Sequence, residues 1–284
     1  MRQKVLRVVA PLLSGTLLIS GVCSSCSVKT ARAECPCILE LELSGGQENT
    51  VRLFYNGQKV HGSQGIVCFE GEGCGTEIEI PRDELVLSGV SGIHECRVSG
   101  DKLCIPVGEE MDEVYAFSAP VDSRGMEMFS LNESLHRQYA YVFLTIKGVS
   151  RENFPYFVRV SGNVCGMDLF SFEPLEGPFN VMVHPVIGEL CRVCVPRQKD
   201  DSLELEFFDK NMTKIGEGDS PETIPIGKFI AREGYNWDDS DLSDIHLSVN
   251  FTRTSINIEV LPWKTTNYED EENNVDMLGG YYDM

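Results

Sequence analysis

Two cysteines near the start of the chain have the neighbours needed for attachment of a lipid. In bacterial lipoproteins the signal peptide is cleaved just before a cysteine whose thiol receives a diacylglyceryl group, and a small residue precedes that cysteine. Ser25 precedes Cys26, whereas the bulkier Val22 precedes Cys23. We therefore predict that Cys26 carries the lipid, with Cys23 as the alternative acceptor. A cleaved signal followed by two ordinary cysteines is the simpler interpretation.

The residues before these cysteines predict export. Three basic side chains within the first seven residues precede an apolar core over 8–19. That core is about 12 residues long, whereas a helix needs about 20 to span a bilayer. A short apolar run behind positive charge is typical of a secretory signal peptide. We expect the signal to occupy residues 1–25 and a lipidated linker to occupy 26–36.

The remaining cysteines could form disulfides. Eleven cysteines in all are unusual for a reducing cytosol and fit an exported chain. Two pairs would close short loops, Cys68 with Cys74 and Cys96 with Cys104. The connectivity of the whole set does not follow from the sequence.

Two groups of side chains have the chemistry of metal ligands without the usual spacing. A zinc site would need a repeated knuckle or a nearby histidine cluster, and the sequence offers neither. Its thiolates would be Cys35, Cys37, Cys191 and Cys194. A calcium site would lack the glycine and terminal glutamate of an EF-hand, and turn or cap residues explain its aspartates more simply. These are Asp238, Asp239, Asp241 and Asp244. We predict no bound metal.

Common catalytic motifs are missing from the sequence. There is no nucleophile elbow, no zinc-binding His-Glu-x-x-His helix and no phosphate-binding loop. The five histidines are scattered along the chain. The formal net charge of −20 repels nucleic acid. We predict a protein that is not an enzyme, with no catalytic residues, no cofactor and no nucleic-acid partner.

Apolar residues recur at every second position through most of the chain, which predicts strands. The earlier strands are expected over 37–43, 51–55, 77–80, 85–87, 93–98, 103–107 and 114–118. The later strands are expected over 139–146, 157–161, 180–183, 190–195, 203–207, 245–251 and 256–260. The longest expected helix runs from Ile226 to Arg232 and is stopped by Gly234. Short strands separated by turns favour β-sandwiches.

A polar stretch without periodicity, at 120–125, separates two groups of strands. We therefore expect an N-terminal β-sandwich over 37–122 and a C-terminal β-sandwich over 123–264. Residues 265–284 contain too little apolar surface to fold alone, so we expect an acidic flexible tail.

Several motifs resemble the FimB/Mfa-type fimbrial subunits, a family of fimbrillin-associated anchor lipoproteins. They are Cys-Ser-Val-Lys at 26–29, Glu-Cys-Pro-Cys at 34–37, Pro-Arg-Gln at 196–198, Asp-Ser-Leu at 201–203, Pro-Ile-Gly-Lys-Phe-Ile at 225–230 and Gly-Tyr-Asn-Trp at 234–237. The resemblance covers nearly the whole mature chain and is most specific in the C-terminal third, up to Trp263. It implies an all-β protein of two tandem transthyretin-like β-sandwich domains.

The resemblance also implies a place and a function. The protein would be lipid-anchored in the cell outer membrane and exposed as part of a surface fimbrium, as an anchor or accessory subunit. Its partners would be pilin subunits, bound by strand pairing. Relatives often follow Lys29 with acidic residues, whereas this chain has Thr-Ala-Arg-Ala at 30–33. The alternative is a surface glycan-binding lipoprotein for nutrient capture, with Tyr235, Trp237 and Trp263 as its candidate aromatic contacts.

Overall fold

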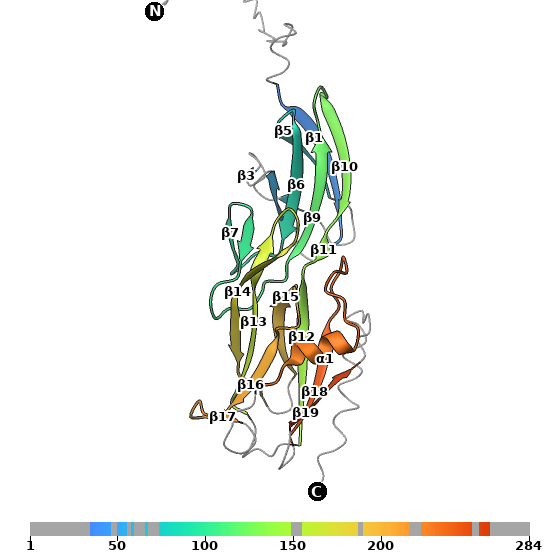
Figure 1. Cartoon of the computed structure of the whole chain (residues 1–284). Helices are drawn as coiled ribbons and strands as arrows, with labels where there is room; N and C mark the ends of the chain where they lie inside the picture. Colours follow the sequence, from blue (N-terminus) through green and yellow to red (C-terminus); the bar gives the residue numbers. More distant parts are fainter. Residues whose placement is uncertain are drawn as a thin grey trace, which may run out of the picture. The chain divides into compact units, whose positions relative to one another are not determined.

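The computed structural model describes residues 35–46, 50–55, 58–59, 66–67, 74–148, 155–186, 190–215, 223–251 and 256–261 (Figure 1). The predicted signal peptide, the lipid acceptors Cys23 and Cys26, Cys68, Trp263 and the predicted tail lie outside these ranges. One compact unit, Pro36–Met284, holds every strand described.

The described residues form strands and one short helix. The first strands are β1 (Cys37–Ser44), β2 (Thr50–Tyr55), β3 (Gln58–Lys59), β4 (Ile66–Val67), β5 (Cys74–Ile80), β6 (Glu84–Ser91), β7 (Arg97–Ser99), β8 (Lys102–Cys104), β9 (Tyr115–Asp122), β10 (Met128–Ser134) and β11 (His136–Arg137). The later elements are β12 (Tyr139–Lys147), β13 (Phe157–Asp168), β14 (Pro174–Val183), β15 (Cys191–Pro196), β16 (Glu204–Phe208), β17 (Lys214–Ile215), α1 (Ile226–Arg232), β18 (Ile245–Phe251) and β19 (Ile256–Leu261).

These strands form four sheets within the described ranges. The first has the order β10-β1-β5, and the second has the order β11-β9-β6-β2-β3, with β4 also paired to β2. The third has the order β15-β12-β18-β19, and the fourth has the order β17-β16-β13-β8-β7, with β14 also paired to β13. In the first sheet the central strand β1 runs antiparallel to β5 and parallel to β10.

The first two sheets share one apolar core because their strands alternate. Leu39, Leu41 and Leu43 on β1 are at most 2% exposed, whereas Glu42 between them is exposed. These leucines belong to one buried cluster with Leu53, Leu87 and Phe117, which come from β2, β6 and β9 of the second sheet. The pattern is that of a β-sandwich, in which two sheets bury their inner faces against each other.

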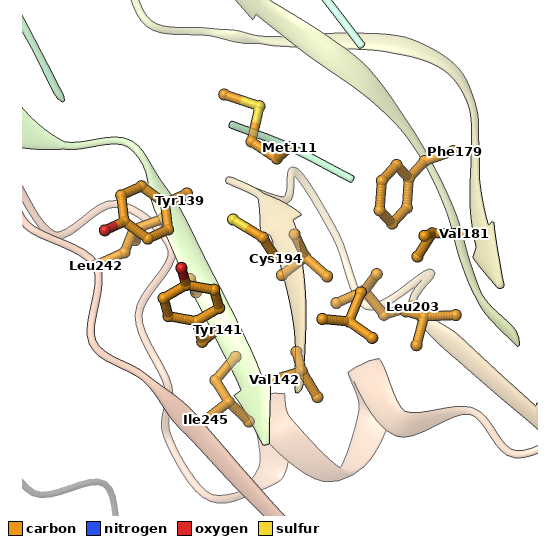
Figure 2. Packing of buried hydrophobic residues seen from close by; sticks show 14 of the residues in the cluster. Met111, Tyr139, Tyr141, Val142, Phe179, Val181, Cys194, Leu203, Leu242 and Ile245 are labelled. Atoms are coloured by element: carbon orange, nitrogen blue, oxygen red, sulfur yellow. The ribbon is translucent and has the colours of Figure 1, made fainter. Parts of the chain in front are cut away.

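The third and fourth sheets contribute to a second, larger core (Figure 2). Val142, Cys194 and Ile245 come from the third sheet, and Phe179 and Val181 come from β14. Both faces of β12 are buried over its first six residues, and β12 lies between β15 and β18. The prediction that this apolar segment forms a central strand is confirmed.

Helix α1 has the predicted bounds. Its second residue, Gly227, lies so close to the backbone of Asp201 that a Cβ atom would lie 2.4 Å from the carbonyl oxygen. After the helix, Gly234 adopts a φ of +82°, and its N–H donates to the carbonyl of Ala231 at 3.0 Å. This is the left-handed position that glycine favours at a helix end.

Strand pairing does not follow a division at residue 122. β10 pairs with β1 of the first sheet, and β8 pairs with β13 of the fourth sheet. The polar stretch at 120–125 contains the turn from β9 to β10, not an extended linker. Ser123 in that turn is fully buried, and its hydroxyl donates to the carbonyl of Pro81 at 2.7 Å.

Candidate functional site

A strand at the end of a sheet presents backbone groups that another chain can pair with, and proteins usually protect such edges. Most of the described edges here are protected. β14 contains Pro178, and its register against β13 is interrupted. On β15 the N–H of Cys194 donates to the Glu110 carboxylate at 2.6 Å, and its carbonyl accepts from the N–H of Met111. β5 carries two exposed glutamates, β19 lies against α1, and β3, β7, β11 and β17 have at most three residues each.

β10 is an edge strand of its sheet, and it has none of these protective features (Figure 1). Its seven residues, Met-Phe-Ser-Leu-Asn-Glu-Ser, include no proline and no lysine. Its register against β1 runs without a bulge from Met128 to Ser134. A long, regular and unprotected edge is a template for pairing with a further strand.

The ladder between β1 and β10 determines which backbone groups of β10 are open. The N–H of Ile38 donates to the carbonyl of Glu127 at 2.9 Å, and the N–H of Leu135 donates to the carbonyl of Ser44 at 2.8 Å. Alternate residues of a parallel strand bond to the same neighbour, so the odd-numbered residues of β10 face β1. The N–H and C=O groups that point away belong to Met128, Ser130, Asn132 and Ser134. Among the described strands none pairs with that side of β10.

The two faces of β10 differ in chemistry. Phe129 and Leu131 are half-buried and pack against the first core. Met128, Ser130 and Asn132 point to the opposite face, where Met128 is 54% exposed. A strand added at this edge would extend the sheet and cover the apolar side chains that the sandwich leaves partly open.

A separate polar cavity of about 550 Å³ lies beside the third sheet. Its lining residues are His94, Glu110, Met111, Asp112, Glu113, Tyr141, Arg192 and Cys194. The Asp112 carboxylate accepts hydrogen bonds from the backbone N–H groups of His94, Glu95 and Cys96, at 2.8, 3.2 and 2.8 Å. This aspartate therefore holds the loop that forms one wall of the cavity.

The charges in the cavity are largely compensated by neighbouring groups. The Tyr141 hydroxyl donates to the Glu113 carboxylate, and the Arg192 guanidinium lies 4.4 Å from the centre of the Tyr141 ring. Burial raises the pKa of Glu110, against the lowering effect of the Cys194 N–H. Burial also raises the pKa of the Cys194 thiol well above its usual value. Both effects follow from removal of water, which disfavours the charged form.

Three of the aspartates considered for calcium, Asp239, Asp241 and Asp244, each have a different partner. Asp241 accepts from the His136 ring at 2.9 Å and from the N–H of Arg137 at 2.7 Å. Asp244 pairs with the Arg137 side chain, and Asp239 accepts from Asn236 at 2.5 Å. Within the described ranges no three histidine, cysteine or acidic side chains are placed to hold a metal.

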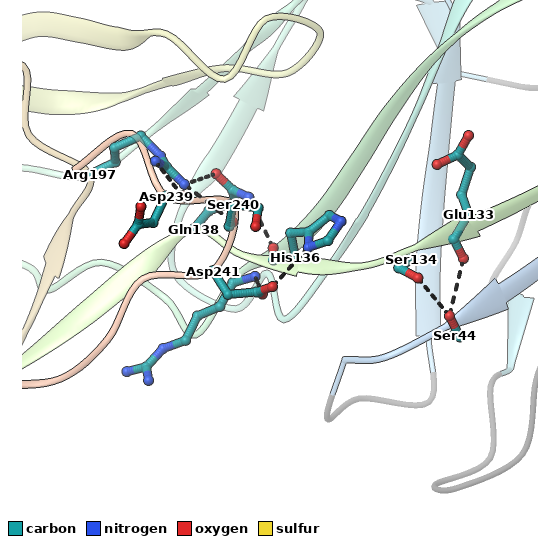
Figure 3. Close-up of polar contacts among 10 residues, drawn as sticks. Ser44, Glu133, Ser134, His136, Gln138, Arg197, Asp239, Ser240 and Asp241 are labelled. Atoms are coloured by element: carbon teal, nitrogen blue, oxygen red, sulfur yellow. Dashed lines mark hydrogen bonds and ion pairs between the residues drawn. The ribbon is translucent and has the colours of Figure 1, made fainter. Parts of the chain in front are cut away.

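This aspartate-rich loop is instead held by an arginine. The Arg197 guanidinium donates to the carbonyls of Trp237, Asp239 (2.9 Å) and Ser240 (3.5 Å), and to the Gln138 side chain at 3.2 Å (Figure 3). The side chain thereby ties 237–240 to the beginning of β12. The loop contacts are those of a structural turn.

Most of the described thiols considered for disulfides and zinc are free in the structure. Cys96 and Cys104 are both free, so the predicted bridge between them is not formed. Cys104 lies on β8 opposite Arg97 of β7 and is half-buried. Cys96 lies just before β7 and is buried beside Asp112. Burial raises the pKa of the Cys96 thiol to about 12. Of the thiols considered for zinc, Cys37 belongs to the first core and Cys194 to the second.

The aromatic residues considered for glycan contact do not form an exposed platform. Tyr235 is 8% exposed, and its hydroxyl donates to the carbonyl of Ser243 at 2.6 Å. Trp237 packs edge-on against Tyr235, with ring centres 4.6 Å apart. Trp263 lies outside the described residues. The Gly-Tyr-Asn-Trp motif therefore has a role in packing.

Comparisons with known proteins show which solved structures have a similar fold. No family model matches the sequence, and no curated protein matches it. A candidate polysaccharide-binding protein from Bacteroides thetaiotaomicron aligns with a TM-score of 0.58 at 13% identity, over 83% of this chain and 99% of that one. The fimbrial anchor protein Mfa2 from Porphyromonas gingivalis aligns with a TM-score of 0.56 at 9% identity, over 82% and 100%. A candidate adhesin from Bacteroides thetaiotaomicron has a TM-score of 0.51 at 10% identity, over 81% and 97%.

The fold is that of fimbrial anchor and adhesin-like structures. At these identities the likeness concerns the fold alone. It confirms the all-β class with tandem β-sandwiches, and it confirms the resemblance to fimbrial subunits at the level of the fold. In the part of the chain that the structure describes, no helix is long and apolar enough to cross a membrane.

Sequence reasoning missed both the open edge and the polar cavity. Residues 128–134 contain three apolar side chains, at Met128, Phe129 and Leu131, and the adjacent pair at 128–129 makes their alternation weak. The faint signal was the spacing of two between Phe129 and Leu131, with polar residues at Ser130 and Asn132. The cavity gave no local signal because its residues come from separate loops and from two neighbouring strands.

Proposed function

We propose that this protein is an accessory or anchor subunit of a surface fimbrium, attached to the outer membrane by a lipid on Cys26. In this proposal it binds a neighbouring subunit by strand pairing at β10 and catalyses no reaction. The observation that carries the proposal is the open edge of β10, with four residues whose backbone groups point away from β1. The fold shared with a fimbrial anchor protein supports it.

Strand addition suits a subunit that must hold a polymer. Main-chain hydrogen bonds supply affinity, and side chains at alternate positions supply specificity. At β10 the added strand would satisfy the outward N–H and C=O groups of Ser130 and Asn132 and would cover Phe129 and Leu131. Burial of these apolar side chains together with a ladder of hydrogen bonds favours slow dissociation.

The lipid would fix the other end of the assembly. A single acyl chain gives only marginal membrane binding, whereas several chains on one cysteine give stable anchoring. The net charge of −20 disfavours attraction of the chain to anionic lipids. Attachment therefore depends on the predicted thioether at Cys26.

A complementation experiment tests the proposal. A strain lacking the gene receives the wild-type gene, the Cys26→Ala variant or the matched Cys23→Ala variant. We expect loss of the gene to release fimbriae into the medium or to change their length. Cys23→Ala should restore cell-bound fimbriae and palmitate labelling, and Cys26→Ala should restore neither. Cell-bound, unaltered fimbriae in both the deletion strain and the Cys26→Ala strain would contradict the anchor function.

A second candidate function is glycan binding. It is favoured by the polar cavity, where Arg192 and Glu110 stand beside Tyr141, and a structural neighbour is named as a candidate polysaccharide-binding protein. Calorimetric titration with soluble polysaccharides would test it, with Arg192→Ala as the variant and the exposed Arg97→Ala as the control. Saturable binding lost only in Arg192→Ala would favour this function over strand pairing.

A further inference from the structure

We propose that the strand pairing with β10 is a basic, amphipathic strand of a neighbouring subunit, apolar on its inward face and rich in lysine or arginine on its outward face. This inference rests on the strand pairing proposed above and adds the chemistry of the partner. It derives from the side chains that share the outward face of the first sheet.

That outward face is acidic on two adjacent strands. Glu40 and Glu42 on β1 stand beside Ser130 and Asn132 of β10. On β5, Glu77 is paired directly with Glu40. A second glutamate of β5, at position 79, is also exposed on this face. Like charges directly opposite each other in a sheet are destabilising.

No basic residue of these strands offsets the charge. The sequences of β1, β5 and β10 contain neither lysine nor arginine. Among the residues that the structure describes, the one hydrogen bond to a glutamate of this face comes from the Ser130 hydroxyl, which donates to Glu40 at 2.7 Å. In the described part of the chain these carboxylates form no group of three that could hold a metal ion. A cationic side chain from a partner therefore complements this face.

The geometry of an extended sheet brings such a side chain within reach. Neighbouring strands lie about 4.8 Å apart, so an added strand would lie about 10 Å from β1 across β10. Its outward side chains would stand beside the short residues Ser130 and Asn132. A lysine or arginine at these positions can extend over them toward Glu40 and Glu42. The glutamates of β5, one strand further away, would add a longer-range field.

The inward face of the first sheet determines which residues the partner strand needs on its other face. Alternate residues of the added strand would point to the side of Phe129 and Leu131, which are half-buried against the first core. Aliphatic residues there would complete the apolar layer. Because side chains alternate between faces, one partner strand meets both requirements by alternating basic and aliphatic residues.

Peptide binding to the full chain tests the proposal. The probes are end-blocked seven-residue peptides in which valine alternates with lysine, threonine or glutamate. Each peptide carries a neutral dye, and its binding is measured by fluorescence anisotropy. At low ionic strength we expect the lysine peptide to bind about tenfold more tightly than the threonine peptide. In 1 M salt, where the screening length is about 3 Å, the two should bind almost equally.

Two double variants separate local from general charge effects. In Glu40→Gln with Glu42→Gln, the preference for lysine should fall to about twofold or less, while the affinity for the threonine peptide is retained. The control, Glu204→Gln with Glu233→Gln, removes the same charge from exposed positions on other elements and should keep the preference. An equal loss of preference in both double variants would overturn the proposal.

A backbone variant distinguishes this inference from the function on which it rests. The N–H of Asn132 points away from β1, so Asn132→Pro removes an outward donor without breaking the ladder to β1. It should weaken binding of both the lysine and the threonine peptide, whereas Asn132→Ala should not. If Asn132→Pro blocks pairing but the peptides show no charge preference, the basic partner is refuted and strand pairing stands. If Asn132→Pro leaves both peptides bound, pairing at this edge is refuted.

Discussion

Replacing Asp112 by alanine should lower the free energy of unfolding more than replacing an aspartate in an exposed turn. Its carboxylate accepts three backbone N–H groups, from His94 (2.8 Å), Glu95 (3.2 Å) and Cys96 (2.8 Å). A hydrogen bond to a charged group contributes about 1.5–3 kcal/mol when it is shielded from water, and less when water can replace it. The Cys96 N–H is buried, whereas the other two are partly accessible. We expect a loss of about 3 kcal/mol in the free energy of unfolding.

Urea unfolding at pH 7 measures this loss, with Asp209→Ala as the matched control. Asp209 accepts from the N–H groups of Asn211 and Thr213, both at 2.8 Å, in an exposed turn where water can replace the carboxylate. Its loss should therefore cost clearly less. Asp112→Asn, which keeps one acceptor oxygen, should lie between wild type and Asp112→Ala. If Asp112→Ala loses no more stability than Asp209→Ala, the carboxylate does not hold the loop.

Two further changes test the packing and the electrostatics. At Gly89 a Cβ atom would lie 2.1 Å from Cε1 of the buried Phe117 ring, so Gly89→Ala should cost about 1–3 kcal/mol by overpacking. Combining it with Phe117→Leu should cost less than the sum of the single changes in urea unfolding, and strict additivity would contradict the clash. Burial alone would raise the pKa of Glu206, but hydrogen bonds from Lys214 and Arg159 outweigh it and lower that pKa from about 4.5. The stabilisation is thus present above pH 4.5 and lost as the pH falls through the lower native value. Glu206→Gln should be less stable than wild type at pH 7 and show a shallower loss of stability below pH 4.5; an unchanged acid profile would contradict this.

Local patterns in the sequence predicted local structure well. The alternation of Leu39, Leu41 and Leu43 with glutamates gave β1 and its buried face, because a strand with one wet side needs this period. The apolar run at 139–146 gave the central strand β12. Gly234 marked the end of α1, because few other residues adopt its backbone angle at low cost.

Pairing between distant segments could not be predicted in the same way. The parallel match of β1 with β10 joins residues about ninety positions apart, and nothing in the weak pattern of 128–134 selects that partner. The stretch at 120–125 was expected to separate two groups of strands because it is polar and lacks periodicity. In the structure, however, Ser123 is buried and its hydroxyl donates to the carbonyl of Pro81. The cavity depends on long-range contacts too, since Glu110 reaches the N–H of Cys194. Such contacts arise from the tertiary fold and leave little trace in local composition.

Amide hydrogen exchange along β10, measured residue by residue with and without bound fimbriae from the same cells, tests strand pairing most directly. In the free protein the amides of Phe129, Leu131 and Glu133 should exchange slowly, because they donate to β1, and the outward amides of Ser130 and Asn132 should exchange fast. On binding, the outward amides should slow at least about tenfold, with little change in the inward ones. If the complex forms and the outward amides exchange as fast as before, the protein does not bind its neighbour by adding a strand at β10.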